Sequence, residues 1–200
     1  MISGVSIAQA MTNSCVAAFL VTMPIVTCAG AQTLKAHAIA DVVGFGGKKI
    51  GTVDFSQTGH GVLIEIELSG LPPGAHGVHI HGSGVCEARK HFASAGPHLS
   101  LVPHAHGYLA KGGPHEGDLP NQFAAGDGAL HASTITNAFT IGNGERSIFD
   151  RDGAAIIVDS KADDYVSQPA GNSGDRIACG VIVRTVAPGT RRGASHNTHA

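Results

Sequence analysis

The residues best suited to chemistry lie between Gly96 and Asn121, in the run GPHLSLVPHAHGYLAKGGPHEGDLPN. This run holds four histidines and one aspartate that could act together: His98, His104, His106, His115 and Asp118. Imidazoles with one carboxylate are a ligand set that zinc takes in proteins. We therefore expect a metal-binding loop here. The alternative is a polar, histidine-rich surface loop without a ligand.

The same run has no helical or strand periodicity, and its five glycines and four prolines predict an irregular loop. A loop of this length inside a compact domain is usually either disordered or ordered by something bound to it. A divalent metal would supply the free energy that orders the loop.

A second pair of histidines lies on a strand predicted over residues 76–82, in the run HGVHIHG. With a period of two, His79 and His81 face one side, about 6.5–7 Å apart along the strand, and the apolar residues next to them face the other. Because this pair stands beside a second histidine cluster, we expect it to be metal ligands rather than ordinary surface histidines. His76, three residues before His79, falls on the opposite face and is expected to be a structural, hydrogen-bonding histidine.

The elements that must position these residues are short strands. Val62, Ile64 and Ile66 alternate with Leu63, Glu65 and Glu67, which is the period of a half-buried antiparallel strand. Further strands are predicted at 34–39, 49–55, 130–136, 154–158 and 178–185. With 28 glycines, no tryptophan and no helix longer than a turn or two, the chain is predicted to be all-β, an antiparallel sandwich or Greek-key barrel.

The first 31 residues predict a secretory signal peptide. They hold no charged side chain, contain an apolar run, and end in Ala29-Gly30-Ala31, a small-x-small cleavage pattern with Gln32 as the first mature residue. A positive segment at the start is missing, and a lipoprotein cut before Cys28 is an alternative. Residues 32–187 are expected to form one domain. Residues 188–200 are expected to be a flexible tail in which His196 and His199 are inert.

Removal of the signal peptide leaves two cysteines, Cys86 and Cys179, and an even pair in an exported chain predicts one disulfide. The formal charge of −2, with 14% charged residues, argues against nucleic acid or an anionic membrane surface as the main partner.

Several motifs resemble the copper,zinc superoxide dismutase family, bacterial periplasmic class: GAHGVHIHGSGVCE, AGPH, HEGDLPN and GNSGDRIACGVI, with the spacing from His98 to His106 and His115. The resemblance covers about residues 33–186. It implies a Greek-key β-barrel with long metal-binding and electrostatic loops, copper and zinc as cofactors, and superoxide as substrate. It also implies a periplasmic or secreted location, no membrane association after signal removal, and in some relatives a homodimer.

Carried over, the resemblance implies a role for most of the candidate residues, but none for His104. The copper ligands would be His79, His81 and His98, the last bridging both metals; the zinc ligands would be His98, His106, His115 and Asp118; the family disulfide would be Cys86–Cys179; Asp163 would link ligands of the two metals; and Arg176 would guide the anion. The disulfide would hold Arg176 near the 76–82 strand, where a cation attracts small anions. A surface arginine and a solvated turn at Asp163 are the alternatives.

One position departs from the family pattern. Asp159 stands where the family has a histidine that is the fourth copper ligand. A carboxylate is a harder ligand than imidazole and suits Cu(I) poorly, so we expect weaker copper retention and lower activity. Whether Asp159 binds copper, turns away or leaves its place to water is open from the sequence. Two functions follow: an exported superoxide dismutase, impaired by Asp159, or a non-catalytic relative that binds zinc or handles copper.

Overall fold

The computed structural model describes residues 36–185, and within this range every strand pairing is antiparallel. The strands are β1 (His37–Gly44), β2 (Lys49–Thr58), β3 (Gly61–Leu68), β4 (Gly74–His76), β5 (Val78–His81), β6 (Gln122–Ala124), β7 (Leu130–Thr136), β8 (Ala155–Asp159) and β9 (Arg176–Thr185). Three 3-10 turns complete the set: η1 (Phe45–Gly47), η2 (Ala88–Lys90) and η3 (Ala93–Ala95). The all-β prediction is confirmed.

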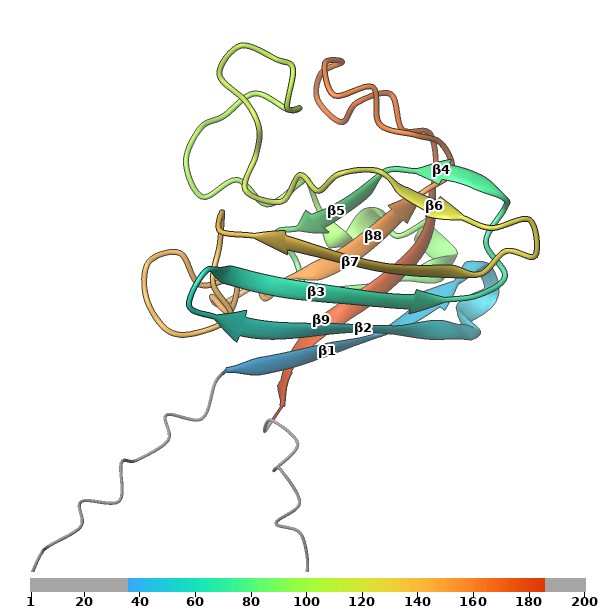
Figure 1. Ribbon diagram of the computed structural model, residues 1–200, viewed down its shortest axis with the longest axis horizontal. Helices are drawn as coiled ribbons and strands as arrows, with labels where there is room; N and C mark the ends of the chain where they lie inside the picture. The colour runs from blue at the N-terminus through green and yellow to red at the C-terminus, as the bar shows by residue number, and fades with distance from the viewer. Residues whose placement is uncertain (1–35, 186–200) are drawn as a thin grey trace, which may run out of the picture. The chain divides into compact units, whose positions relative to one another are not determined.

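Seven strands form one sheet in the order β5-β8-β9-β1-β2-β3-β7, and β4 and β6 form a separate pair (Figure 1). One face of each strand in the large sheet contributes to a single buried cluster, from Val42 on β1 and Phe55 on β2 to Ile80 on β5 and Leu130 on β7. A sheet whose outermost strands share one core must curl around it. The result is a half-barrel.

Strand β3 shows the predicted alternation, with its even-numbered apolar residues buried and Glu65 and Glu67 exposed. Strand β8 is buried along its whole length because both of its faces are covered. Its even-numbered residues face the main core, while Ala155 and Ile157 pack against Phe92 and Ala95 in a smaller cluster. The disulfide Cys86–Cys179 lies in this smaller cluster and confirms the predicted pairing.

The strand expected over 76–82 is wrong in one respect, because the chain breaks it at Gly77. The Gly77 N–H donates to the Lys161 carbonyl, and the Gly77 carbonyl accepts from the Asp159 N–H. These bonds end the short strand β4, which pairs with β6, and start β5, which pairs with β8. The first strand also differs: it runs to Gly44 rather than ending at residue 39.

Two long loops lie at one end of the sheet (Figure 1). The first, residues 96–121, contains no named helix or strand and matches the predicted irregular loop. The second, residues 160–175, joins β8 to β9. Within residues 36–185 no helix is long and apolar enough to span a membrane. The predicted signal peptide and C-terminal tail lie outside the described residues.

Candidate metal centre

The first long loop is fixed to the edge of the sheet by its backbone. The Ile80 N–H donates to the Gly117 carbonyl, the Leu99 N–H donates to the Ile80 carbonyl, and the Gly117 N–H donates to the Leu99 carbonyl. A Cβ at Gly117 would overlap the Ile80 carbonyl oxygen, so only glycine allows this approach. The pairing sets His98 opposite His81 and Asp118 opposite His79.

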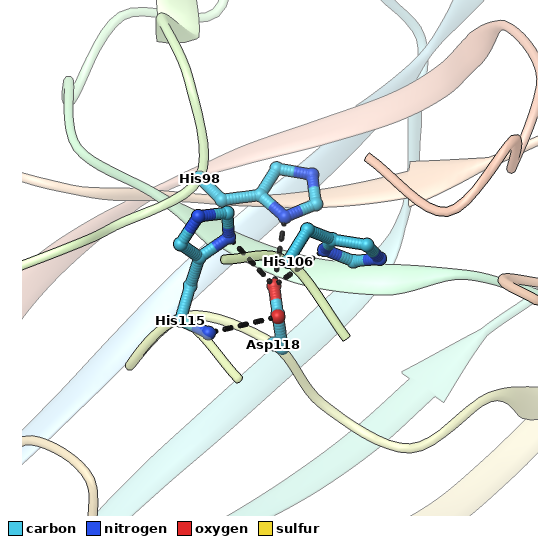
Figure 2. A group of neighbouring side chains, drawn as sticks. All are labelled: His98, His106, His115 and Asp118. Carbon is cyan, nitrogen blue, oxygen red and sulfur yellow. Dashed lines mark hydrogen bonds and ion pairs between the residues drawn. The ribbon is translucent and has the colours of Figure 1, made fainter. Parts of the chain in front are cut away.

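Three imidazoles of the first loop converge on one oxygen of Asp118 (Figure 2). From Asp118 Oδ1, the Nδ1 atoms of His98, His106 and His115 lie at 2.8, 3.1 and 3.4 Å. All four side chains offer ligand atoms within 4.8 Å of one another. A tetrahedron with Zn–N and Zn–O bonds of about 2.0–2.1 Å has edges of about 3.3 Å, close to these distances.

The other carboxylate oxygen of Asp118 accepts hydrogen bonds from the backbone. Asp118 Oδ2 accepts from the backbone N–H groups of Gly107 (2.9 Å) and His115 (3.0 Å), which leaves Oδ1 to face the imidazoles. The Nδ1 atom of His115 is buried and makes no hydrogen bond within the described chain. Burial raises the pKa of Asp118, but the bonds from His98 and Gly107 outweigh it and hold that pKa well below its usual value. The donor set fits a zinc ion.

A second group consists of His79, His81 and His98, whose ligand atoms also lie within 4.8 Å of one another. The His81 Nδ1 lies 2.9 Å from the Gly96 carbonyl oxygen. Since a carbonyl can only accept, Nδ1 carries the proton and Nε2 has a free lone pair. That Nε2 is buried and has no hydrogen-bond partner among residues 36–185. Burial lowers the pKa of His81 well below its usual value, so the ring is neutral. An unpaired buried acceptor of this kind fits a metal ligand.

His98 belongs to both groups. Its Nδ1 faces Asp118 in the first group, and its ring stacks on that of His79 with centroids 4.0 Å apart. Burial lowers the pKa of His98 and keeps the ring neutral despite its bond to Asp118. An imidazole with one nitrogen in each group is suited to join two metal ions.

Asp163 forms a hydrogen bond with one histidine of each group. Its Oδ2 lies 2.9 Å from His79 Nε2, and its Oδ1 lies 3.1 Å from His106 Nε2. Burial raises the pKa of Asp163, but hydrogen bonds from His79, the Tyr165 N–H and His106 lower it to about 2, so the carboxylate stays ionised. A carboxylate on the far nitrogen of a ligand histidine fixes the ring orientation. A Cβ at Gly171 would overlap this Asp163 oxygen, which explains the glycine there.

Asp159 points at the second group and not toward solvent. Its Oδ2 lies 3.0 Å from His79 Nδ1 and accepts a hydrogen bond from Ser173 Oγ at 2.8 Å. Burial would lower the pKa of His79, but the bonds to Asp159 and Asp163 outweigh it and raise that pKa from 6.5 to about 9. Asp159 therefore faces His79, and its role as a copper ligand stays a prediction.

Two side-chain amides, neither of them predicted from the sequence to have a role, connect the two long loops. Gln168 Oε1 accepts from the His106 N–H, and Gln168 Nε2 donates to the His106 carbonyl, both at 2.9 Å. Asn121 Nδ2 donates to the Asp163 carbonyl, and Asn121 Oδ1 accepts from the Asp163 N–H, both at 2.8 Å. Each amide thus forms two hydrogen bonds with the backbone of a residue in the other loop. Because the partners are more than 40 positions apart in the sequence, no local sequence pattern predicts these hydrogen bonds.

Arg176 lies beside the second group. Its guanidinium donates to the carbonyls of Phe92 (2.9 Å) and Gly96 (2.8 Å), and the latter is the carbonyl that also holds His81. Arg176 and His98 line the same open pocket, whose volume is about 580 Å³. The disulfide to Cys179, three residues along β9, holds this end of the strand against the 86–96 segment.

Two further histidines stand apart from both groups. His76 is buried, with Nδ1 2.6 Å from the Asp159 carbonyl and Nε2 2.7 Å from the Pro72 carbonyl, as expected for a structural histidine. His104 is partly exposed, and its Nδ1 lies 3.5 Å from Glu116 Oε1. His196 and His199 lie outside the described residues.

Comparison with known proteins decides the family. The family described as copper/zinc superoxide dismutase (SODC) matches residues 49–182. Superoxide dismutase [Cu-Zn] 1 of Aquifex aeolicus is 42% identical over 154 residues, which cover 76% of this chain and 89% of the relative. The chain belongs to the copper/zinc superoxide dismutase family. Members of this family use copper and zinc, and the two groups of histidines and aspartates are able to bind such ions.

The chain is also similar to proteins that are described as dismutase-like. Superoxide dismutase-like protein YojM of Bacillus subtilis is 36% identical over 140 residues, which cover 68% of this chain and 71% of the relative. A crystal structure of a SOD-like protein from Bacillus subtilis superposes with a TM-score of 0.69 and 33% identity, covering 72% of this chain and 97% of that chain. Similarity therefore extends both to dismutases and to dismutase-like proteins.

Proposed function

We propose that this protein is an exported superoxide dismutase that converts superoxide to oxygen and hydrogen peroxide at a copper-zinc centre, with turnover lowered by Asp159. The observation that supports it most is His98, which joins two groups of ligand atoms beside a pocket that also contains Arg176. The first group would hold zinc, and His79, His81 and His98 would hold copper. Copper bound there supplies one-electron oxidation of one superoxide and one-electron reduction of the next.

The residues around the second group have roles of their own in this proposal. Arg176 would attract the superoxide anion toward the pocket, and because this is a charge effect it weakens as salt is added. The second nitrogen of the His98 ring would be placed to hold and release a proton beside the pocket, since its Nδ1 faces Asp118. Asp163 would keep His79 and His106 in their orientations.

The test uses mature protein from Gln32, loaded with zinc, titrated with copper and assayed for superoxide dismutation. We expect one zinc and one copper per chain with salt-sensitive turnover, and an increase of about tenfold or more in Asp159→His, since imidazole suits both copper oxidation states. If neither protein turns over superoxide when fully loaded, the proposal is wrong.

A second function is favoured by Asp159 and by the similarity to a dismutase-like protein. In this alternative the chain is a non-catalytic metal-binding protein that stores or delivers zinc or copper. Zinc that stays bound, copper that is lost on reduction, and no turnover would support it.

Export is also part of the proposal, on the pattern of residues 1–31. The mass of the protein recovered outside the cytoplasm tests it. A chain beginning at Gln32 is expected. A lipid-modified chain beginning at Cys28 would contradict this cleavage site, and a full-length chain in the cytoplasm would contradict export.

A further inference from the structure

The metal centre is reached by two separate pockets. One is the pocket described above, which Arg176 and His98 line; we call it the Arg176 pocket. The other has a volume of about 370 Å³ and is lined by His115 and Asp118 of the first group, together with His60; we call it the His60 pocket. The two pockets have no lining residue in common within the described chain. The first group therefore has an opening of its own.

His60 occupies a fixed position at the edge of the His60 pocket, on the tip of the β2–β3 hairpin. The Thr58 hydroxyl donates to the Gly61 carbonyl at 2.8 Å and accepts from the His60 N–H at 3.1 Å. A Cβ at Gly61 would overlap the carbonyl oxygen of Thr136, so only glycine lets the hairpin lie directly against strand β7. These contacts hold the backbone of His60, while its side chain remains exposed.

The imidazole of His60 is available to a ligand. It makes no side-chain hydrogen bond or ion pair with residues 36–185. Deeper in the same pocket lies His115, whose Nδ1 is buried and also has no hydrogen-bond partner in the described part of the chain. A free imidazole at the opening and a candidate zinc ligand farther in are both groups that bind Zn²⁺.

The charges of the two pockets favour different ions. A divalent cation that approaches through the Arg176 pocket meets the guanidinium of Arg176, which repels it. Asp175 also lines that pocket, but its carboxylate is exposed, so solvent and salt screen its charge. The His60 pocket contains the carboxylate of Asp118 and no lysine or arginine among the residues that the structure describes. A cation is therefore favoured in the His60 pocket.

We infer that the His60 pocket is the entrance through which zinc reaches and leaves the first group, and that His60 is a transient ligand of the ion on its way. His60 is not among the four side chains whose ligand atoms lie together in the first group, so it binds the ion during passage and not at its destination. The inference rests on the proposed function only in that zinc occupies the first group. It requires neither copper nor turnover.

A transient ligand has a kinetic signature that a structural residue lacks. Entry and exit pass through the same transition state, so loss of the ligand slows zinc binding and zinc release by the same factor. The dissociation constant is the ratio of the two rates and stays unchanged. A residue that merely supports the folded site would instead speed release and weaken the affinity.

The test uses copper-free mature protein and measures three quantities. Stopped-flow absorbance follows zinc uptake by metal-free protein and zinc release to an excess of a chromogenic chelator, and competition with the same chelator gives the dissociation constant. His60→Ala removes the imidazole, and His60→Glu replaces it with a carboxylate, which also binds zinc. The backbone at His60 does not have a positive φ, so it accepts either residue without strain.

A second pair of variants narrows one pocket at a time. Ile135→Trp enlarges a side chain that lines the His60 pocket and is 54% exposed, so the larger ring can be accommodated at the surface. Ala93→Trp, at an exposed residue that lines the Arg176 pocket, is the matched control.

We expect His60→Ala to slow zinc uptake and zinc release each by about tenfold, which corresponds to about 1.4 kcal/mol in the barrier, with an unchanged dissociation constant. His60→Glu should recover most of both rates. Ile135→Trp should slow both rates at constant affinity, and Ala93→Trp should behave like the wild type.

Unchanged rates in either His60→Ala or Ile135→Trp would overturn the inference, because the ion would then enter by another route, such as opening of the 96–121 loop. Faster release with weaker affinity in His60→Ala would overturn it too, as would slower exchange in Ala93→Trp or a wild type that binds no zinc. Turnover is a separate result. His60-dependent exchange in a protein that is inactive when fully loaded would contradict the proposed function alone, and an active enzyme with His60-independent exchange would contradict the inference alone.

Discussion

Gln168 holds the backbone of His106 by a hydrogen bond in each direction, although the two residues are 62 positions apart. His106 is at once a candidate zinc ligand and a hydrogen-bond partner of Asp163. The loop of residues 160–175 therefore holds the main chain of a candidate zinc ligand that belongs to the loop of residues 96–121. In turn, Asn121 of the 96–121 loop makes two hydrogen bonds with the backbone of Asp163 in the 160–175 loop.

Replacement of Gln168 should weaken zinc binding without unfolding the sheet. Gln168→Ala removes both bonds to His106, each worth about 1 kcal/mol, and we expect the zinc affinity to fall by about tenfold. Competition with a chromogenic zinc chelator measures it. Val166→Ala, an exposed residue in the same loop, is the matched control and should bind zinc like the wild type. Equal affinities in both variants would show that the Gln168 bonds do not support the site.

Asp163 is expected to affect both metals at once. Asp163→Asn replaces the ionised acceptor that orients His79 and His106, so we expect the affinities for copper and for zinc both to fall by about 10–100-fold. Metal titrations of each group measure this. Asp175→Asn removes an exposed carboxylate in the same loop and should leave both affinities unchanged. A loss confined to one metal would contradict the linking role.

Arg176 is expected to act on substrate capture. Arg176→Gln should lower kcat/KM for superoxide by about tenfold and flatten its dependence on ionic strength, because the guanidinium charge steers the anion. Metal counts are measured alongside, since Arg176 shares the Gly96 carbonyl with His81. Arg184→Gln, near the far end of strand β9, makes the same charge change and serves as control. An unchanged salt dependence in Arg176→Gln, with full metal content, would rule out steering by this residue.

The stability of the protein stripped of its metals should depend on pH through His79. Its pKa in the folded chain is about 9, above the ordinary value of 6.5. Because the pKa of His79 is higher in the folded chain than in the unfolded chain, protonation of His79 stabilises the fold. This contribution is complete below pH 6.5 and is lost as the pH rises through 9. We expect the free energy of unfolding to fall by on the order of 3 kcal/mol across this window. Urea unfolding at several pH values measures it.

The partner of His79 provides the control for this pH effect. Asp159→Asn removes one of the two carboxylates that raise the pKa of His79, so the decline with pH should be smaller and should end at a lower pH. Zinc- and copper-loaded protein should not show the decline, since a metal ligand nitrogen does not carry the proton. A stability that is flat or rises between these pH values in the stripped wild type would contradict the assignment.

The sequence by itself determined the fold class and most of the candidate ligands. Alternation along 62–68 and the irregular run 96–121 are local patterns, and both appear in the structure as predicted. The period of a strand likewise set His79 and His81 on one face, because side-chain direction on a strand follows from position alone. The break at Gly77 was missed because it depends on hydrogen bonds to residues 159–161, more than 80 positions away.

Only the tertiary structure decided how those ligands are held. The Gly96 carbonyl that selects the His81 tautomer, the Ser173 hydroxyl that fixes Asp159, and the amide of Gln168 all come from other segments of the chain. None of these contacts has a spacing that a linear pattern could reveal. A hydrogen bond requires two groups to come within about 3 Å, and for residues distant in sequence that proximity exists only once the curled sheet brings its loops together.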